Sequence, residues 1–324
     1  MNLQHCIVAG FCAAALIVLP AHAQAGPANS LAFTPATNGS FTFDTGELRG
    51  VLRAEGKSTG LQSVTHVASG RRLDTSMGLM SHYRVFTTGK RYGAGAWDWP
   101  STAKLDERGA VEVLWPANED RPFELRAVYR WMTPGALDVE TIVLAKQNLP
   151  KFESFLASYF QPGFTNALAV VSGSGNPDSP SYLAAAKSAG DWQMFPRDDA
   201  AVSVIQDGRW KLPPNPVEWT IRPRFLRPVA IRCDKASNLA AVLMVRQDEC
   251  FTVAMPYETE GHRSLYFSLF GHDLKARGFR YGFAPGAAGV HLRRIQGGVQ
   301  GSGWELISDD LARHLRHSRE VLGE

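Results

Sequence analysis

The sequence predicts an all-β fold, a large antiparallel β-sandwich in one domain with a short C-terminal helix. Three observations lead to this prediction. Short segments rich in Val, Ile, Phe, Tyr and Leu follow one another along most of the chain. Clusters of Gly, Pro, Asn and Asp separate them, and these residues favour turns because they accept positive φ or restrict φ. Helical periodicity is scarce.

Many of the expected strands alternate apolar and polar residues, which suits a sheet with one face in the core. They cover 40–46, 48–56, 61–69, 110–117, 123–132, 136–145, 152–160, 201–208, 228–233, 241–246, 251–257 and 264–271. A short helix is expected over 179–190, stopped by Gly190, and a second over 308–324, capped by Ser308. No fixed-period repeat is visible in the sequence, which argues against a propeller or a β-helix.

The first 25 residues read as a signal peptide. An apolar run extends from Ile7 to Leu19, Pro20 breaks it, and Ala21-His22-Ala23 offers a cleavage site of small residues. The run is too short to span a bilayer as a helix. We therefore expect one mature domain over 26–324 with a periplasmic or secreted location; an N-terminal membrane anchor is the alternative.

Composition is that of an ordinary globular protein, with 44% hydrophobic and 20% charged residues. The net charge is only +3 and the basic residues are dispersed, which argues against nucleic acid as a partner. No second apolar span follows, so no membrane association is expected after removal of the signal. We expect no cofactor and no metal, because no HExxH, paired CxxC, Walker A or dinucleotide motif occurs and the histidines are scattered.

Two cysteines remain in the mature chain, Cys233 and Cys250. An oxidising compartment favours a disulfide between them. If 228–233, 239–246 and 250–256 formed a plain three-stranded meander, however, the two residues would lie at opposite ends of the sheet. That separation is on the order of 25 Å, beyond the reach of a disulfide. We therefore expect the cysteines to be unbridged.

Three segments carry a resemblance to a known family: GLMSHYRVFTTGKRYGAGAWDWPSTAKL (78–105), RPFELRAVYRW (121–131) and SLYFSLFGHDL (264–274). They resemble uncharacterised secreted bacterial β-sandwich proteins, which are similar to the galactose-mutarotase-like supersandwich. That resemblance implies a β-supersandwich and a link to carbohydrates, since aldose epimerases, glycosidase and lyase domains and sugar-binding modules share the architecture. No epimerase motif matches residue by residue, and a fold does not fix a function.

The densest group of candidate site residues lies within 81–99. In a strand over 82–86, His82 and Arg84 would share one face and Tyr83 and Val85 the other. Histidine shuttles protons near neutral pH, and arginine binds carboxylates with a bidentate fork. His82, Asp98 and Tyr83 are catalytic candidates, and Arg84, Lys90, Trp97 and Trp99 are substrate-binding candidates.

The motif YGAGAWDWPST, residues 92–102, leaves two interpretations open. Trp97 and Trp99 at i, i+2 would lie on one face of an extended segment, either as platforms for sugar rings beside Asp98 or as core residues. In the second interpretation Arg84 and Asp98 form a structural ion pair.

Two further segments add candidates. In 257–273, Glu260 and His262 are close enough in sequence to form an acid/base pair, although a solvated strand face would give the same pattern. Loops over 191–199 and 206–219 contain Arg197, Arg209 and Trp210 as substrate-binding candidates, together with Trp192 and Trp219; ordinary turns are the alternative.

The sequence thus predicts a carbohydrate-active or carbohydrate-binding protein that acts on a poly- or oligosaccharide. Asp98 or Glu260 paired with His82 or His262 would suit glycosidase or epimerase chemistry. Tyr83 or His82 as a base, with Arg84 or Lys90 against a uronate, would suit a polysaccharide lyase. A non-catalytic extracytoplasmic module that binds glycan or protein remains the alternative to an enzyme.

Overall fold

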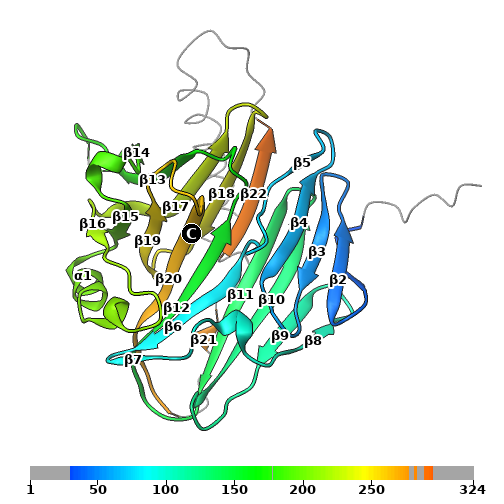
Figure 1. The fold of residues 1–324 in the computed structure, drawn as a ribbon, viewed down its shortest axis with the longest axis horizontal. Helices are drawn as coiled ribbons and strands as arrows, with labels where there is room; N and C mark the ends of the chain where they lie inside the picture. Colours follow the sequence, from blue (N-terminus) through cyan, green and yellow to red (C-terminus); the bar gives the residue numbers. More distant parts are fainter. Residues whose placement is uncertain (1–29, 177, 277–280, 283–287, 295–324) are drawn as a thin grey trace, which may run out of the picture.

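The computed structural model describes residues 30–176, 178–276, 281–282 and 288–294, and it confirms a mainly antiparallel all-β fold (Figure 1). The strands form three sheets. The five-stranded sheet runs in the order β1 (Thr34–Pro35), β2 (Ser40–Asp44), β3 (Leu48–Arg53), β4 (Gly60–His66) and β5 (Arg71–Arg72). The predicted signal peptide over 1–25 and the predicted helix over 308–324 lie outside the described residues.

The ten-stranded sheet runs in the order β14 (Pro180–Ala184), β13 (Asn166–Ser172), β17 (Phe225–Asp234), β18 (Leu239–Val245), β22 (Ala288–Arg294), β11 (Ala136–Ala145), β10 (Phe123–Thr133), β9 (Val111–Trp115) and β8 (Thr102–Leu105), and β21 (Tyr281–Gly282) pairs with β11. The seven-stranded sheet runs in the order β16 (Thr220–Ile221), β15 (Trp192–Pro196), β19 (Cys250–Pro256), β20 (Ser264–Leu274), β12 (Leu149–Tyr159), β6 (Ser81–Thr87) and β7 (Lys90–Arg91). Within the described residues, no helix is long and apolar enough to cross a membrane.

All three sheets contribute to one large core. Strand β10 alternates buried and half-buried residues, so that Leu125, Ala127 and Tyr129 enter this core, as the sequence pattern predicts. Val85 of β6 and Phe267 of β20 enter it from the seven-stranded sheet. Burial of one apolar face per strand supplies the main stabilising free energy of such a sandwich.

The seven-stranded sheet is covered on its other face as well. A second cluster of buried residues lies there, in which Phe86 of β6 and Phe155 of β12 pack against Trp210 and Tyr266 of β20 stacks on Phe155. The short helix α1 (Asp199–Ile205) and the turn η3 (Arg209–Lys211) form part of the cover. Strand β12 is therefore almost continuously buried from Phe152 to Tyr159, and this outer face positions the candidate site.

Two predicted elements are wrong. The segment 201–208 was expected to be a strand, but α1 occupies it: the Asp198 side chain caps the helix by accepting the Ala201 N–H at 2.8 Å. Ala201, Val204 and Ile205 have the i, i+3, i+4 spacing of a buried helical face, which the β-branched residues obscured. The segment 179–190 was expected to be a helix, but it forms edge strand β14 and the turn η2 (Lys187–Ala189), because pairing with β13 overrides the alanine propensity.

Cys233 and Cys250 are free and buried, as expected, although the expected meander is wrong. Cys233 lies one residue before the end of β17 in the ten-stranded sheet, whereas Cys250 is the first residue of β19 in the seven-stranded sheet. The chain changes sheets between β18 and β19, so the cysteines belong to different layers.

Candidate functional site

A β-bulge in β6 decides which side chains reach the site. Val85 lies opposite Ser154 of β12 and His82 lies opposite Leu156, so Tyr83 and Arg84 together face the single residue Phe155. The extra residue interrupts the alternation of the strand and re-aims side chains. As a result Tyr83 and Arg84 both lie on the outer face of the sheet, where they line a pocket. The predicted shared face of His82 and Arg84 is therefore wrong.

His82 lies between the sheets instead. Its Nδ1 is 2.8 Å from Ser154 Oγ, its Nε2 is 3.3 Å from Thr141 Oγ1, and its ring meets Trp115 edge-on at 5.6 Å. Burial lowers the pKa of His82 to about 3, because the imidazolium would lose its hydration there. His82 is thus a neutral core histidine at physiological pH, and it does not line the pocket.

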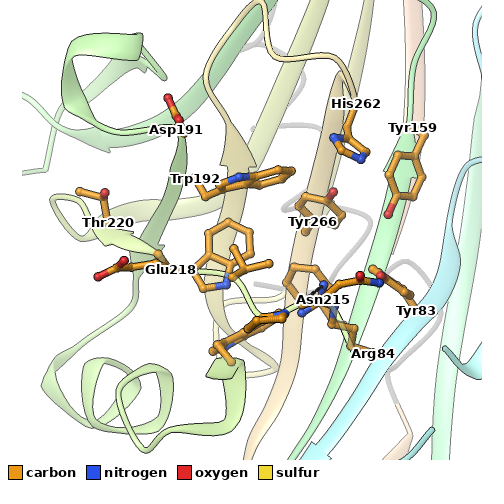
Figure 2. Close-up of a pocket in the computed structure, with 15 residues that line it drawn as sticks. Tyr83, Arg84, Tyr159, Asp191, Trp192, Asn215, Glu218, Thr220, His262 and Tyr266 are labelled. Carbon is orange, nitrogen blue, oxygen red and sulfur yellow. Dashed lines mark hydrogen bonds between the residues drawn. The ribbon is translucent and has the colours of Figure 1, made fainter. Parts of the chain in front are cut away.

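The pocket lies on the outer face of the seven-stranded sheet, where β6, β12 and β20 form its floor and the segment after η3 forms its opposite wall (Figure 2). Its volume of about 740 Å³ falls within the range of small-molecule sites. It is lined by Tyr83, Arg84, Phe155, Tyr159, Asp191, Trp192, Trp210, Asn215, Pro216, Val217, Glu218, Trp219, Thr220, His262 and Tyr266.

Aromatic rings dominate this lining and support one another. Trp219 meets Trp210 edge-on at 5.3 Å and Trp192 at 5.7 Å, and Phe155 stacks on Tyr266 at 4.6 Å. Each such pair contributes about 0.5–1.5 kcal/mol beyond area burial. The indole Nε1 atoms of Trp210 and Trp219 are buried without a hydrogen-bond partner in the described structure. The walls therefore present rigid flat aromatic faces to the cavity.

Two buried tyrosines complete the floor. Burial raises the pKa of Tyr266 to about 12, and it raises the pKa of Tyr159 well above its usual value, with the neighbouring Tyr266 adding to the shift. Both hydroxyls stay protonated at neutral pH, because the phenolate would be poorly solvated. They can donate and accept hydrogen bonds, but they are poor bases.

Glu260 and His262 form the expected pair at the rim. Glu260 Oε1 lies 2.9 Å from His262 Nδ1, and Glu260 Oε2 accepts the His262 backbone N–H at 2.7 Å. The His262 ring lies 5.4 Å from Trp192 and 6.4 Å from Tyr159, with 57% of its side chain exposed. A carboxylate on one ring nitrogen fixes the imidazole and leaves Nε2 available to a ligand.

The motif YGAGAWDWPST supports the pocket from behind. Residues Ala96–Asp98 form a 3-10 turn, so Trp97 and Trp99 point into different clusters and the expected shared face is wrong. Trp97 stacks on Tyr83, and Trp99 packs against Phe123 in the main core. Neither indole lines the pocket.

Asp98 pairs with residues other than Arg84, so the ion pair of the second interpretation is wrong. Its Oδ2 accepts the Trp97 Nε1–H at 3.0 Å, and its Oδ1 lies 3.4 Å from Lys57 Nζ. Asp98 is half-exposed and lies outside the pocket.

Gly95 is required by close packing, since a Cβ there would lie 2.8 Å from Trp97 Nε1 and 3.1 Å from Tyr83 Cδ2.

Three further substrate-binding candidates do not line the pocket. Lys90 Nζ donates to the Asp120 carbonyl, and Arg197 Nε pairs with Asp198 at 2.8 Å. Arg209 is fully buried, with Nη1 2.9 Å from Glu153 Oε2 and Nη2 2.8 Å from Asp207 Oδ2. Arg209 thereby anchors the turn that carries Trp210. In the described ranges no group of three or more His, Cys, Asp or Glu side chains could hold a metal ion.

No family model and no curated protein matches the chain. Among solved structures it is similar to a galactose mutarotase-like protein from Lactobacillus casei (TM-score 0.49, 12% identity, 79% of this chain and 100% of that chain). It is also similar to a galactose mutarotase related enzyme from Lactobacillus acidophilus (TM-score 0.49, 11%, 78% and 97%) and to a putative aldose 1-epimerase from Klebsiella pneumoniae (TM-score 0.45, 9%, 85% and 83%). Similarity at this level assigns no activity to the chain.

Of the site residues predicted from sequence, the pocket brings together Tyr83, Arg84, Trp210 and His262. Trp192 and Trp219 were noted in the predicted loops but were not selected as site residues. The lining residues that were not predicted include Tyr159, Asp191, Asn215, Glu218 and Tyr266. A usable signal was the long Pro-rich loop after Trp210, because long loops over a rigid sheet often carry binding groups.

Proposed function

We propose that the chain binds a carbohydrate in the aromatic pocket. The observation that carries the proposal is the combination of three indole rings, Trp192, Trp210 and Trp219, with polar groups around one small-molecule-sized cavity. Flat aromatic faces suit the C–H faces of sugar rings, and the polar ends of Trp and Tyr suit hydroxyls. A purely apolar ligand would leave those polar groups without partners, which is costly.

The polar groups are distributed as a sugar requires. Asp191 and Glu218 lie on one side of the pocket, and His262 and Tyr159 lie on the other (Figure 2). Carboxylates accept hydrogen bonds from hydroxyls, while the protonated tyrosines and the imidazole both donate and accept. A ring held between these sides can satisfy hydroxyls along both of its edges.

Calorimetric titration with mono- and oligosaccharides tests this proposal. Trp192→Ala removes a half-buried ring from the wall, and we expect binding to weaken by at least about tenfold. Leu105→Ala is the matched control, since Leu105 is an exposed apolar residue of β8 that does not line the pocket. Failure of every sugar tested to bind, or equal binding by both variants, would count against the pocket.

The Glu260–His262 pair favours a catalytic form of the same function. A carboxylate-held imidazole beside a sugar can transfer a proton to or from a hydroxyl, as opening of a hemiacetal ring requires. Saturation-transfer NMR of anomer exchange would detect such activity. We expect His262→Gln to abolish any rate above the buffer rate and Glu260→Gln to lower it, with sugar affinity changed less than the rate. An unchanged rate in His262→Gln would contradict the catalytic form of the proposal and leave only the binding function.

We also propose that the mature protein acts in the periplasm or outside the cell. The support is the apolar run from Ile7 to Leu19 followed by Pro20 and Ala21-His22-Ala23. Mass spectrometry of the exported protein should give a mature N-terminus near residue 24 or 26. Recovery of the uncleaved chain from the membrane fraction would support an anchor instead.

A further inference from the structure

Two arginines meet at one end of the pocket beside the Pro-rich loop. Arg84 Nη2 donates to the Asn215 carbonyl at 2.9 Å, and Arg91 Nη1 donates to the Pro214 carbonyl. Arg91 also donates to the carbonyls of Gly93 and Ala94. Burial lowers the pKa of Arg91, and electrostatic repulsion between its guanidinium group and that of Arg84 lowers it further. Two cations therefore converge on consecutive backbone carbonyls.

Neither arginine has an acidic partner in the part of the chain that the structure describes. No carboxylate lies within salt-bridge distance of Arg84 or Arg91, whereas the buried Arg209 has two such partners. Arg84 is only 5% exposed, and its Nε and Nη1 atoms are buried with no hydrogen-bond partner. A buried cation without a counter-charge is costly, and unsatisfied donors of this kind call for a ligand or another explanation.

The environment of Arg84 limits what that ligand can be. The guanidinium carbon lies 5.0 Å from the Tyr83 ring centroid and 5.3 Å from the Trp210 ring centroid, so aromatic rings flank the group. An anion must then approach an edge of the guanidinium plane. Nη2 carries two hydrogens and Asn215 uses one, so the second can form a fork with either Nε or Nη1. A planar carboxylate matches such a fork.

We propose that the pocket takes a sugar that carries a carboxylate, and that Arg84 binds this carboxylate. The inference rests on the proposed carbohydrate function and names its substrate class. Asp191 and Glu218 line the pocket away from Arg84, so repulsion directs the carboxylate of the sugar towards Arg84 and its hydroxyls towards the two acids (Figure 2).

Calorimetry on matched sugar pairs tests the proposal with the unaltered protein. Each pair consists of a methyl glycoside of glucose, galactose or mannose and the corresponding uronate, which differ only by a hydroxymethyl group against a carboxylate. We expect the uronate of at least one pair to bind at least about tenfold more tightly. Equal affinity within every pair that binds would overturn the carboxylate proposal and leave carbohydrate binding intact. Absence of binding by all six sugars would overturn the carboxylate proposal and remove these single sugar units as ligands, whereas the oligosaccharide titrations described above decide carbohydrate binding.

Variants then assign the preference to Arg84. Arg84→Gln should abolish the preference, so that the uronate and the neutral sugar of a pair bind with equal affinity, and Arg84→Lys should retain part of it because the charge remains without the fork. Arg91→Gln is the matched control, because Arg91 adds charge but does not line the pocket, and it should reduce the preference only a few-fold. A preference that survives in Arg84→Gln, or a sulfated sugar bound as tightly as the uronate, would contradict carboxylate recognition by Arg84.

Discussion

The ring of Trp97 stacks on the ring of Tyr83, with centroids 4.2 Å apart and 13° between the planes. Tyr83 lines the pocket and Trp97 does not, so the contact joins the pocket wall to the YGAGAWDWPST segment behind it. The indole N–H of Trp97 donates a hydrogen bond to Asp98. Trp97 also belongs to the outer hydrophobic cluster that contains Phe86. The segment therefore contributes to the site by fixing Tyr83 rather than by touching a ligand.

Trp97→Ala should destabilise the protein and weaken sugar binding together. Removal of a buried indole from a packed cluster costs about 3–5 kcal/mol of unfolding free energy. Urea denaturation measures this loss. A variant of unchanged stability with lost binding would mean that Trp97 contacts the sugar directly, contrary to the structure.

Trp192→Ala should weaken sugar binding with little loss of stability. Trp192 is half-buried and lies at the pocket wall, so its loss should shift the urea midpoint little while affinity falls. The same two measurements on both tryptophan variants separate support of the site from contact with the ligand. Similar profiles for the two variants would refute that division.

His82→Gln should lower stability and leave sugar affinity unchanged, because His82 lies between the sheets. Its folded pKa of about 3 is below the unfolded value of 6.5, so its stabilising contribution is present above pH 6.5 and is lost as pH falls towards 3. Acid titration of unfolding free energy should therefore be steeper in the wild type than in the variant. A large loss of affinity in His82→Gln would restore a role for this residue in the site.

Arg209→Met should cost about 3–5 kcal/mol, because it leaves Glu153 buried without its cation. Burial raises the pKa of Glu153, while pairing with Asp207 and Glu153 raises that of Arg209. The double variant Arg209→Met with Glu153→Met should recover part of the loss, since the fully buried Glu153 charge is then gone and only the partly exposed Asp207 lacks its cation. Equal or greater destabilisation in the double variant would show that the ion pair itself is strongly stabilising.

Glu249 should make the protein less stable in mild alkali. Burial, with repulsion from Asp248, raises the pKa of Glu249 to about 8 from its usual value of 4.5, and its Oε2 atom is buried without a partner. A raised folded pKa gives a stabilising contribution that is present below pH 4.5 and is lost as pH rises through 8. Glu249→Gln should therefore unfold at a higher urea concentration than the wild type at pH 9, with a smaller difference at pH 5. No pH dependence of that difference would contradict the shift.

Sequence patterns predicted the fold where local and tertiary signals agree. Strand β10 alternates in sequence and packs one face in the core, so its bounds are predicted almost to the residue. The segment of α1 was wrongly predicted to be a strand because Val202, Val204 and Ile205 favour strands in isolation. The Asp198 cap and the packing of this segment over the seven-stranded sheet favour a helix instead. The assignment of β19 to a different sheet from β18 depends on long-range packing that local periodicity does not encode.

The site was partly predictable for a related reason. The polar and aromatic residues clustered in 81–84 and 260–262 include Tyr83, Arg84 and His262, which line the pocket. The bulge opposite Phe155 places His82 and Arg84 on opposite faces of the sheet instead of the expected shared face, because one inserted residue changes every side-chain direction beyond it. Tyr159 and Asn215 reach the pocket from segments far apart in sequence, and only the assembled sheet brings them together.

Indole N–H shifts measured by NMR during a sugar titration test most directly whether the aromatic pocket binds carbohydrate. The chain has eight tryptophans, so each resonance can be assigned by substitution. We expect saturable shifts at Trp192, Trp210 and Trp219, which line the pocket, with little change at Trp115 and Trp131 in the main core. Saturable sugar binding that leaves the three pocket indoles unshifted would contradict the proposed site.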